Sequence, residues 1–150
     1  MGERERAIFP RGAGRATGGL QIRCAVFARK GNTILFIRHR RHPVYGSTWT
    51  LPGGTLDYGR NPRDSAARIL RAQAGVGSDA MRLLGVQSST EGDWILTFHF
   101  EATIEGEPTP GEGIQEVRFA PLAQGPSPDL HDIARADLEK YLFHELAKAP

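Results

Sequence analysis

The stretch Leu51-Pro52-Gly53-Gly54-Thr55-Leu56-Asp57-Tyr58-Gly59-Arg60-Asn61-Pro62 decides the fold of this chain. Its Gly-Gly pair predicts tight backbone geometry. Asn61 and Pro62 predict the start of a helix, because asparagine is a good N-cap and proline suits the first helical position. Asp64 lies three residues after the cap, where its charge favours the helix N-terminus. The helix should run to about Ala74 and end at Gly75.

Segments with strand character lie on both sides of this helix. Residues 21–28 alternate between apolar and polar side chains, and residues 33–38 are β-branched and aromatic, so the Lys30-Gly31-Asn32 turn predicts a hairpin. Further strands are expected at residues 49–51, 81–88, 94–104 and 114–119. A last helix, capped by Ser127 and starting at Pro128, follows the helical period. This order predicts an α+β fold with a mixed sheet sandwiched between helices.

Length and composition indicate one ordinary globular domain. The chain has 150 residues, of which 39% are hydrophobic and 24% charged. Residues 1–19 are rich in Gly, Ala and Arg and are expected to form a flexible arm, followed by a single domain at 20–150. No apolar run approaches the roughly 20 residues of a membrane helix. The single cysteine, Cys24, is expected to be a buried thiol, and the expected location is the cytoplasm.

The net charge limits the kinds of partner. The chain has a formal charge of +2 at pH 7, which suits anionic metabolites and also nucleic acid. No zinc finger or basic–aromatic pattern supports nucleic acid, so a small anionic molecule is favoured. The five histidines show no metal-ligand spacing, and His39 and His42 are considered as contacts for an anionic ligand.

The stretch from Gly54 to Val76 resembles the signature of the Nudix (MutT-like) hydrolase superfamily, G-x5-E-x7-R-E-U-x-E-E-x-G-U, in which U is a bulky aliphatic residue. Gly54, Arg68 and Gly75-Val76 match its fixed positions, and Trp49-Thr50-Leu51-Pro52-Gly53-Gly54 resembles the segment that opens the motif in this family. The resemblance covers residues 20–146. It implies the Nudix fold, a loop–helix–loop that cradles a diphosphate, substrates with a nucleoside diphosphate linked to another group, and hydrolysis with Mg²⁺.

The four glutamates of the signature are replaced by Arg60, Ile69, Ala72 and Gln73. Magnesium prefers several oxygen ligands in near-octahedral geometry. Ile69 and Ala72 offer no ligand atom, Gln73 offers one neutral carbonyl oxygen, and Arg60 adds a positive charge. We therefore expect little or no metal-dependent hydrolysis, no catalytic residue and no metal ligand within the motif, and no cofactor.

The same replacements favour direct binding of an anion. Arginine binds phosphate through two parallel hydrogen bonds, so the charged side chains near the motif are candidate contacts. The predicted ligand-binding residues are Arg23, Arg38, Arg40, Gly53, Gly54, Arg60 and Arg68. A structural role is favoured for Arg68, and Arg60 is equally compatible with a solvated position.

Three functions remain open at the level of sequence. The first is a protein that binds a nucleotide or nucleotide sugar without metal-dependent cleavage. The second is an active hydrolase that uses metal ligands outside the motif, such as Asp57, Glu112 or Glu116. The third is a protein-interaction scaffold, which includes the formation of a homodimer.

Overall fold

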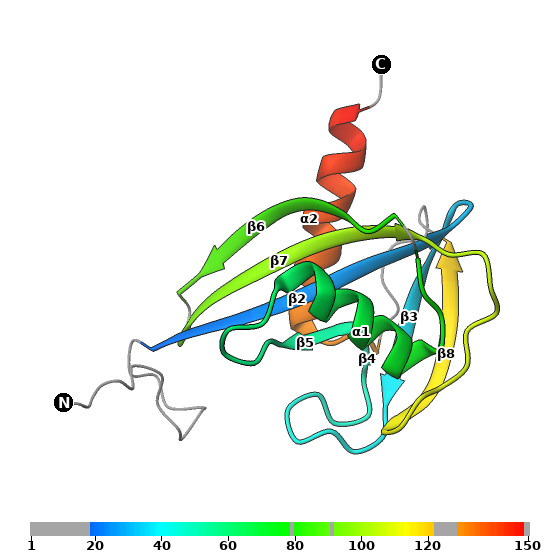
Figure 1. The fold of residues 1–150 in the computed structure, drawn as a ribbon, viewed down its shortest axis with the longest axis horizontal. Helices are drawn as coiled ribbons and strands as arrows, with labels where there is room; N and C mark the ends of the chain where they lie inside the picture. Colours follow the sequence, from blue (N-terminus) through cyan, green and yellow to red (C-terminus); the bar gives the residue numbers. More distant parts are fainter. Residues whose placement is uncertain (1–18, 79, 91, 122–128, 149–150) are drawn as a thin grey trace.

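The computed structural model describes residues 19–78, 80–90, 92–121 and 129–148. Its elements form one sheet and two helices (Figure 1). The strands are β2 (Leu20–Lys30), β3 (Thr33–His39), β4 (Trp49–Thr50), β5 (Gly53–Thr55), β6 (Arg82–Ser89), β7 (Trp94–Thr103) and β8 (Ile114–Pro121), and the helices are α1 (Pro62–Ala74) and α2 (Asp132–Lys148).

The sheet is mixed and forked. Its strand order is β4-β3-β2-β7-β6, with β5 paired to β2 and β8 paired to β3. Strands β2 and β7 run parallel, and the other strand pairs are antiparallel. The β2–β3 hairpin is paired only at Arg29↔Ile34 and Lys30↔Thr33. Beyond these pairs β5 takes the place beside β2, at Arg23–Ala25, so the fork leaves room between β5 and the end of β3.

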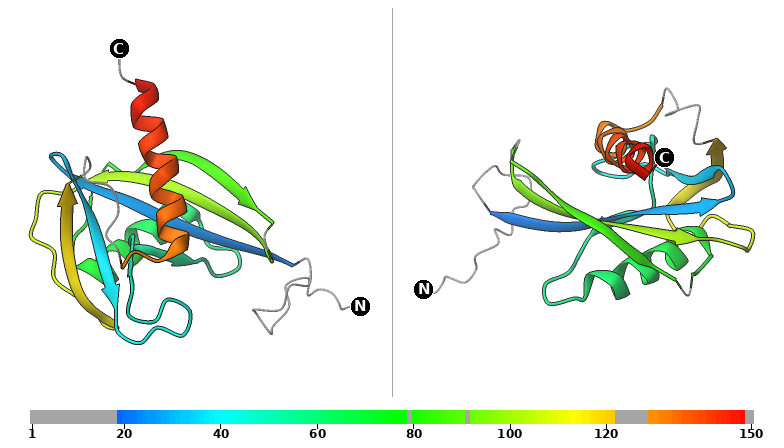
Figure 2. Two further views of the ribbon diagram at one scale, coloured as in Figure 1. Left: turned by 180° about the vertical axis from the view of Figure 1, so that it is seen from behind. Right: turned by 90° about the horizontal axis from the view of Figure 1, so that it is seen from above.

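Each face of the sheet is covered by one helix, as Figure 2 shows from above. Side chains alternate along β2: Cys24 and Val26 pack in the core under α1 with Leu70. Ala25 and Phe27 belong to a second core under α2, together with Ala134, Leu138 and Tyr141. The α+β arrangement expected from the sequence, a mixed sheet between helices, is confirmed.

Helix α1 begins and ends where the sequence predicts. The side chain of Asn61 accepts a hydrogen bond from the backbone N–H of Asp64 at 3.1 Å. At the other end Gly75 has φ 70°, and its N–H donates to the Arg71 carbonyl at 2.9 Å. The loop after β7 also packs here: a Cβ at Gly111 would lie 1.8 Å from the Ala72 carbonyl oxygen, so only glycine allows this approach.

Helix α2 begins at Asp132. The expected start at Pro128 is wrong, because residues 129–131 are not helical. Leu130 instead forms a parallel bridge with Trp49. The backbone N–H of Trp49 donates to the Asp129 carbonyl at 3.1 Å, and that of His131 donates to the Trp49 carbonyl at 2.9 Å. These long-range bonds hold the segment extended up to His131. The predicted cap Ser127 lies outside the described residues, as does the arm at 1–19 except for its last residue.

Two further features follow from the sheet. Gly53–Thr55, expected as part of a turn, is a short strand because it pairs with β2. Cys24 is a free thiol with no exposed surface, and burial raises its pKa, which confirms a buried thiol. Neither described helix is long and apolar enough to cross a membrane.

Candidate ligand-binding site

A cavity of about 360 Å³ lies at the fork of the sheet, between the end of β3, strand β5 and helix α1. Its lining residues are His39, His42, Val44, Tyr45, Gly53, Gly54, Thr55, Ile69 and Gln73. None of these side chains is an acid, an arginine or a lysine. The cavity is large enough for part of a nucleotide-sized ligand, and polar groups reach it chiefly from imidazole rings and from Gln73.

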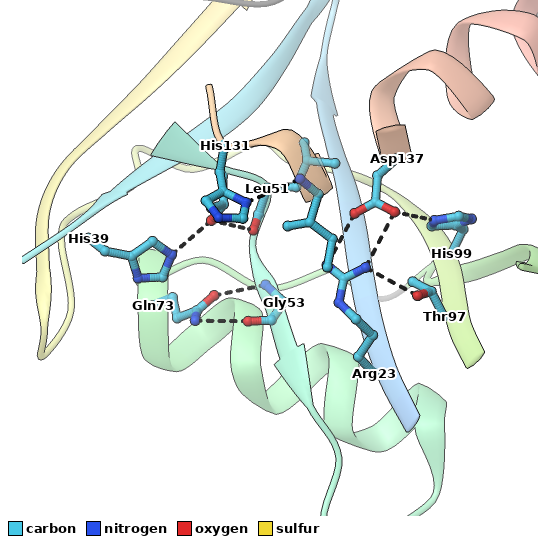
Figure 3. Close-up of polar contacts among 11 residues, drawn as sticks. Arg23, His39, Leu51, Gly53, Gln73, Thr97, His99, His131 and Asp137 are labelled. Atoms are coloured by element: carbon cyan, nitrogen blue, oxygen red, sulfur yellow. Dashed lines mark hydrogen bonds and ion pairs between the residues drawn. The ribbon is translucent and has the colours of Figure 1, made fainter. Parts of the chain in front are cut away.

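The floor of the cavity is fixed by a pair of hydrogen bonds between Gln73 and Gly53. The side-chain Oε1 of Gln73 accepts from the Gly53 N–H at 3.0 Å, and Nε2 of Gln73 donates to the Gly53 carbonyl at 3.1 Å. Figure 3 shows this two-point contact between α1 and β5. A Cβ at position 53 would lie 2.2 Å from the Cys24 carbonyl oxygen, so the backbone of Gly53 is held against β2 as well.

The residues at the four signature positions do not suit a magnesium ion. Gln73 commits its only oxygen to the Gly53 N–H, and Ile69 lines the cavity with an apolar side chain. Ala72 and Arg60 are exposed. Among the described residues, no group of three or more His, Cys, Asp and Glu side chains is placed to hold a metal ion. The donor set therefore does not provide the several oxygen ligands that magnesium prefers.

A cluster of aromatic rings forms one wall of the site. His42 and Tyr45 stack with ring centroids 4.5 Å apart, and His39 meets His42 at 5.0 Å and Tyr45 at 4.9 Å. His131, which precedes α2, meets Tyr45 edge-on at 5.1 Å. The wall thus joins three parts of the chain: the end of β3, the loop after it and the segment before α2.

Two of these histidines have their protons fixed by the backbone. Nδ1 of His42 accepts from the N–H groups of Val44 and Tyr45 at 2.9 and 3.1 Å. Nδ1 of His131 accepts from the Ile133 N–H at 3.1 Å. A nitrogen that accepts a hydrogen bond carries no proton, so each neutral ring carries its proton on Nε2. Burial, followed by the neighbouring His131, lowers the pKa of His42.

His39 is held differently. The Thr50 hydroxyl donates to the Leu51 carbonyl at 3.0 Å, so its oxygen accepts from Nε2 of His39, which lies 2.8 Å away. This leaves Nδ1 of the neutral ring as an acceptor. Burial, followed by the neighbouring His42 and His131, lowers the pKa of His39 to about 4. His39 is therefore neutral near pH 7.

The structure places Arg23 away from the cavity. Arg23 points toward α2, where its guanidinium contacts Asp137 at 3.1 and 3.3 Å and donates to the Thr97 hydroxyl at 3.1 Å. His99 completes this buried network through Nε2, 2.9 Å from Asp137 Oδ1. In Figure 3 the Arg23 group lies on one side of β2 and the Gln73–Gly53 pair on the other. Here Arg23 joins α2 to the sheet.

The other predicted residues are distributed around the cavity. Gly53 and Gly54 line it, and their contact with a ligand stays a prediction. Arg38 donates through Nε to the Ser47 carbonyl at 2.9 Å, and Arg40 is exposed. Arg60 and Arg68 are exposed at the start and middle of the α1 region. None of the five arginines is among the residues that line the cavity.

Tyr45 is not among the residues predicted from the sequence, and Gln73 was considered there only as a single neutral oxygen at a glutamate position of the signature. In the sequence, His42 and Tyr45 are two aromatic rings three residues apart in a loop. They form a wall of the site only because the fold brings this loop together with the end of β3 and the segment before α2. The signal for Gln73 was its amide, which donates as well as accepts. A glutamate at that position would have no donor for the Gly53 carbonyl.

Comparison with known proteins identifies the family. Residues 19–142, most of the chain, match the NUDIX domain. The chain therefore belongs to the Nudix family, and its mixed sheet with a helix on each face is the Nudix fold. The resemblance seen in the sequence is confirmed.

Solved structures share this fold at low sequence identity. A MutT NUDIX hydrolase from Burkholderia pseudomallei is 22% identical with a TM-score of 0.69, and the match covers 80% of this chain and 96% of that one. A MutT protein from Methanosarcina mazei Go1 is 16% identical with a TM-score of 0.72 over 87% and 96%. The NUDIX domain of Shewanella oneidensis NrtR, solved in complex with ADP ribose, is 19% identical with a TM-score of 0.64 over 84% and 87%.

Proposed function

We propose that this protein binds a nucleoside diphosphate derivative in the cavity beside Gly53 and Gly54, with little or no metal-dependent hydrolysis. The observation that supports this most directly is the Gln73–Gly53 pair. It fills a former glutamate position with an amide that closes the floor of the site through two hydrogen bonds.

The residues around the cavity suit binding better than cleavage. Metal-assisted hydrolysis needs a cation that polarises the phosphate and a group that activates water. Gln73 and Ile69 supply neither, and the carboxylates considered as substitutes, Asp57, Glu112 and Glu116, are not among the lining residues. The aromatic wall, in contrast, offers faces for stacking and ring N–H groups for hydrogen bonding, which a nucleotide derivative can use.

The class of ligand is supported by the relatives of this chain. The family implies a nucleoside diphosphate linked to a second group, and a neighbour of the same fold was solved with ADP ribose. We take ADP-ribose as the first compound to test. The proposal extends to nucleotide sugars, because these share the bridged diphosphate.

A thermal-shift panel tests the proposal. ADP-ribose, ADP-glucose and ADP are each compared with adenosine, once with Mg²⁺ and once with a chelator. Binding to the folded state raises stability by about 2.7 kcal/mol at a hundredfold excess over Kd. We expect equal shifts with and without the cation. A shift that requires Mg²⁺ would favour the hydrolase, and no shift with any compound would contradict binding and favour the scaffold.

A further inference from the structure

The cavity has a wall of imidazole rings and no permanently charged side chain in its lining, although the proposed ligand is an anion. Taking a phosphate from water into such a site is costly unless a positive charge accompanies it. The predicted arginines do not line the cavity, and the signature positions do not suit a metal ion. A lining group that is neutral while the site is empty can supply this charge by taking up a proton.

His39 is the ring that is arranged to gain a proton without breaking a contact. Its Nε2–H already donates to the Thr50 oxygen, and Nδ1 of the neutral ring has no hydrogen-bond donor among the described residues. Figure 3 shows His39 beside Gln73, and both residues line the cavity. A proton on Nδ1 would keep the bond to Thr50 and add a donor toward the ligand.

His42 differs in this respect. Its Nδ1 accepts from two backbone N–H groups, and a proton there would place three donors against one another. The ring also belongs to a loop closed by mutual backbone bonds of 2.8 Å between His42 and Gly46. His42 therefore stays neutral in this loop conformation and offers its Nε2–H as a hydrogen-bond donor only.

In the described part of the chain, no permanently charged side chain is among the groups that surround His39. The groups around it are His42 and Tyr45 from the loop, Thr50 from β4, Ile69 and Gln73 from α1, His131 before α2, and Ile114 opposite it on β8. The nearest arginines in sequence are occupied or exposed: Arg38 donates to the Ser47 carbonyl, and Arg40 is on the surface.

We propose that the diphosphate of the ligand binds against His39, and that His39 takes up one proton from solvent at Nδ1 as it binds. No covalent bond changes. The imidazolium then donates Nε2–H to Thr50 and Nδ1–H to a phosphate oxygen, beside the Nε2–H of His42. This inference rests on the proposed function and specifies how the site supplies its positive charge.

The expected consequence is an affinity that falls as pH rises. The pKa of His39 in the empty site is about 4. If the anion restores it to the ordinary 6.5, the affinity at pH 5 should be about thirtyfold higher than at pH 8. ADP-ribose is the suitable probe, because its bridged diphosphate lacks the titration near pH 6 that a terminal phosphate has.

Calorimetric titration with ADP-ribose from pH 5 to pH 8, in the presence of a chelator, tests the inference. The wild-type chain should show the pH slope and take up a proton in buffers of different ionisation enthalpy. His39→Gln keeps a donor for Thr50 but does not titrate, so its affinity should be independent of pH. Glu139→Gln is the control, because it removes an exposed titratable side chain of α2 that does not line the cavity, and it should keep the slope.

The outcomes separate this inference from the proposed function. Absence of ADP-ribose binding at every pH would overturn the inference, and absence of a shift with every compound of the thermal panel would overturn the proposed function as well. Binding with no pH slope, or a slope that persists in His39→Gln, would overturn the inference alone. If His39→Gln does not fold, proton NMR of the wild-type imidazole rings gives the answer: the pKa of His39 should rise on addition of ADP-ribose, and an unchanged pKa would overturn the inference.

Discussion

At the scale of single residues, Gln73 should be important for stability, because its side chain both accepts a hydrogen bond from Gly53 and donates one to it. In Gln73→Glu the carboxylate still accepts from the Gly53 N–H, but the Gly53 carbonyl loses its donor and faces a negative charge. The Gly53 carbonyl is partly buried at this contact, so leaving it without a donor should cost about 1 kcal/mol, the lower end for buried groups. We expect a loss of that size in the free energy of unfolding, measured by urea denaturation.

Ala72→Glu is the control for this experiment. It restores another glutamate of the signature and adds the same charge, but position 72 is exposed and its side chain has no such contact. Its stability should change by less than about 0.5 kcal/mol. Equal effects of the two substitutions would show that added charge, rather than the Gln73–Gly53 pair, determines the result.

His39 should make the stability of the ligand-free protein depend on pH. Its pKa is about 4 in the folded protein and 6.5 in an ordinary histidine. Unfolding therefore takes up a proton between these values, so the stabilisation is complete above pH 6.5 and is lost as pH falls toward 4. The loss attributable to His39 should reach about 3 kcal/mol.

Thermal melting from pH 7 to pH 4 measures this contribution, with His39→Gln as the comparison. The melting temperature of the wild type should fall more steeply toward acid pH than that of the variant. Parallel curves would mean that carboxylates, and not His39, account for the acid sensitivity.

The residues of the site were only partly predictable from the sequence. Gly53 and Gly54 lie at the cavity because the local motif fixes their position. Arg23 was expected as a ligand contact, but alternation along β2 places it with Ala25 on the face opposite to Cys24. Which helix covers which face is a property of the whole fold, so the sequence does not show that Arg23 meets α2.

At the scale of elements, α2 is attached to the sheet through a buried ion pair. Arg23 and Asp137 form two hydrogen bonds, and His99 also contacts Asp137. The side chains of Arg23 and Asp137 are 10% and 7% exposed, so loss of either charge leaves the other in a poorly solvated position. Removing one partner of a buried pair costs about 3–5 kcal/mol.

Asp137→Asn should therefore lower the free energy of unfolding by several kcal/mol, measured by chemical denaturation near pH 7. Glu139→Gln removes one negative charge from an exposed position of the same helix and should have little effect. A small effect of Asp137→Asn would show that Arg23 does not depend on this carboxylate.

The two helices differ in how well the sequence predicts them. Helix α1 has a local N-cap and a local glycine stop, and both of its ends were predicted. The start of α2 depends on the bridge between Leu130 and Trp49, two residues far apart in the chain. Helical period and a nearby proline do not reveal such a contact, because backbone bonds to a distant strand compete with the first turn of the helix.

At the scale of the whole molecule, the forked sheet produces the site. Strand β3 separates from β2 after two residue pairs, and β5 takes its place beside β2. Helix α1, β5 and the loop after β3 surround the opening. The Nudix fold thus keeps its cavity at the position of the family signature, while the side chains at the four glutamate positions are changed. The fold was predictable because Gly54, Arg68 and Gly75 match fixed positions of the family signature. This match does not depend on the residues at the four glutamate positions.

The central claim is that this cavity binds a bridged diphosphate without cleaving it. Phosphorus-31 NMR of ADP-ribose with the protein, recorded over a day with Mg²⁺ and with a chelator, tests both parts in one measurement. We expect the two diphosphate resonances to shift or broaden equally in both samples and no monophosphate signal to appear. Growth of AMP and ribose 5-phosphate signals in the Mg²⁺ sample, or resonances unaffected by the protein, would contradict it.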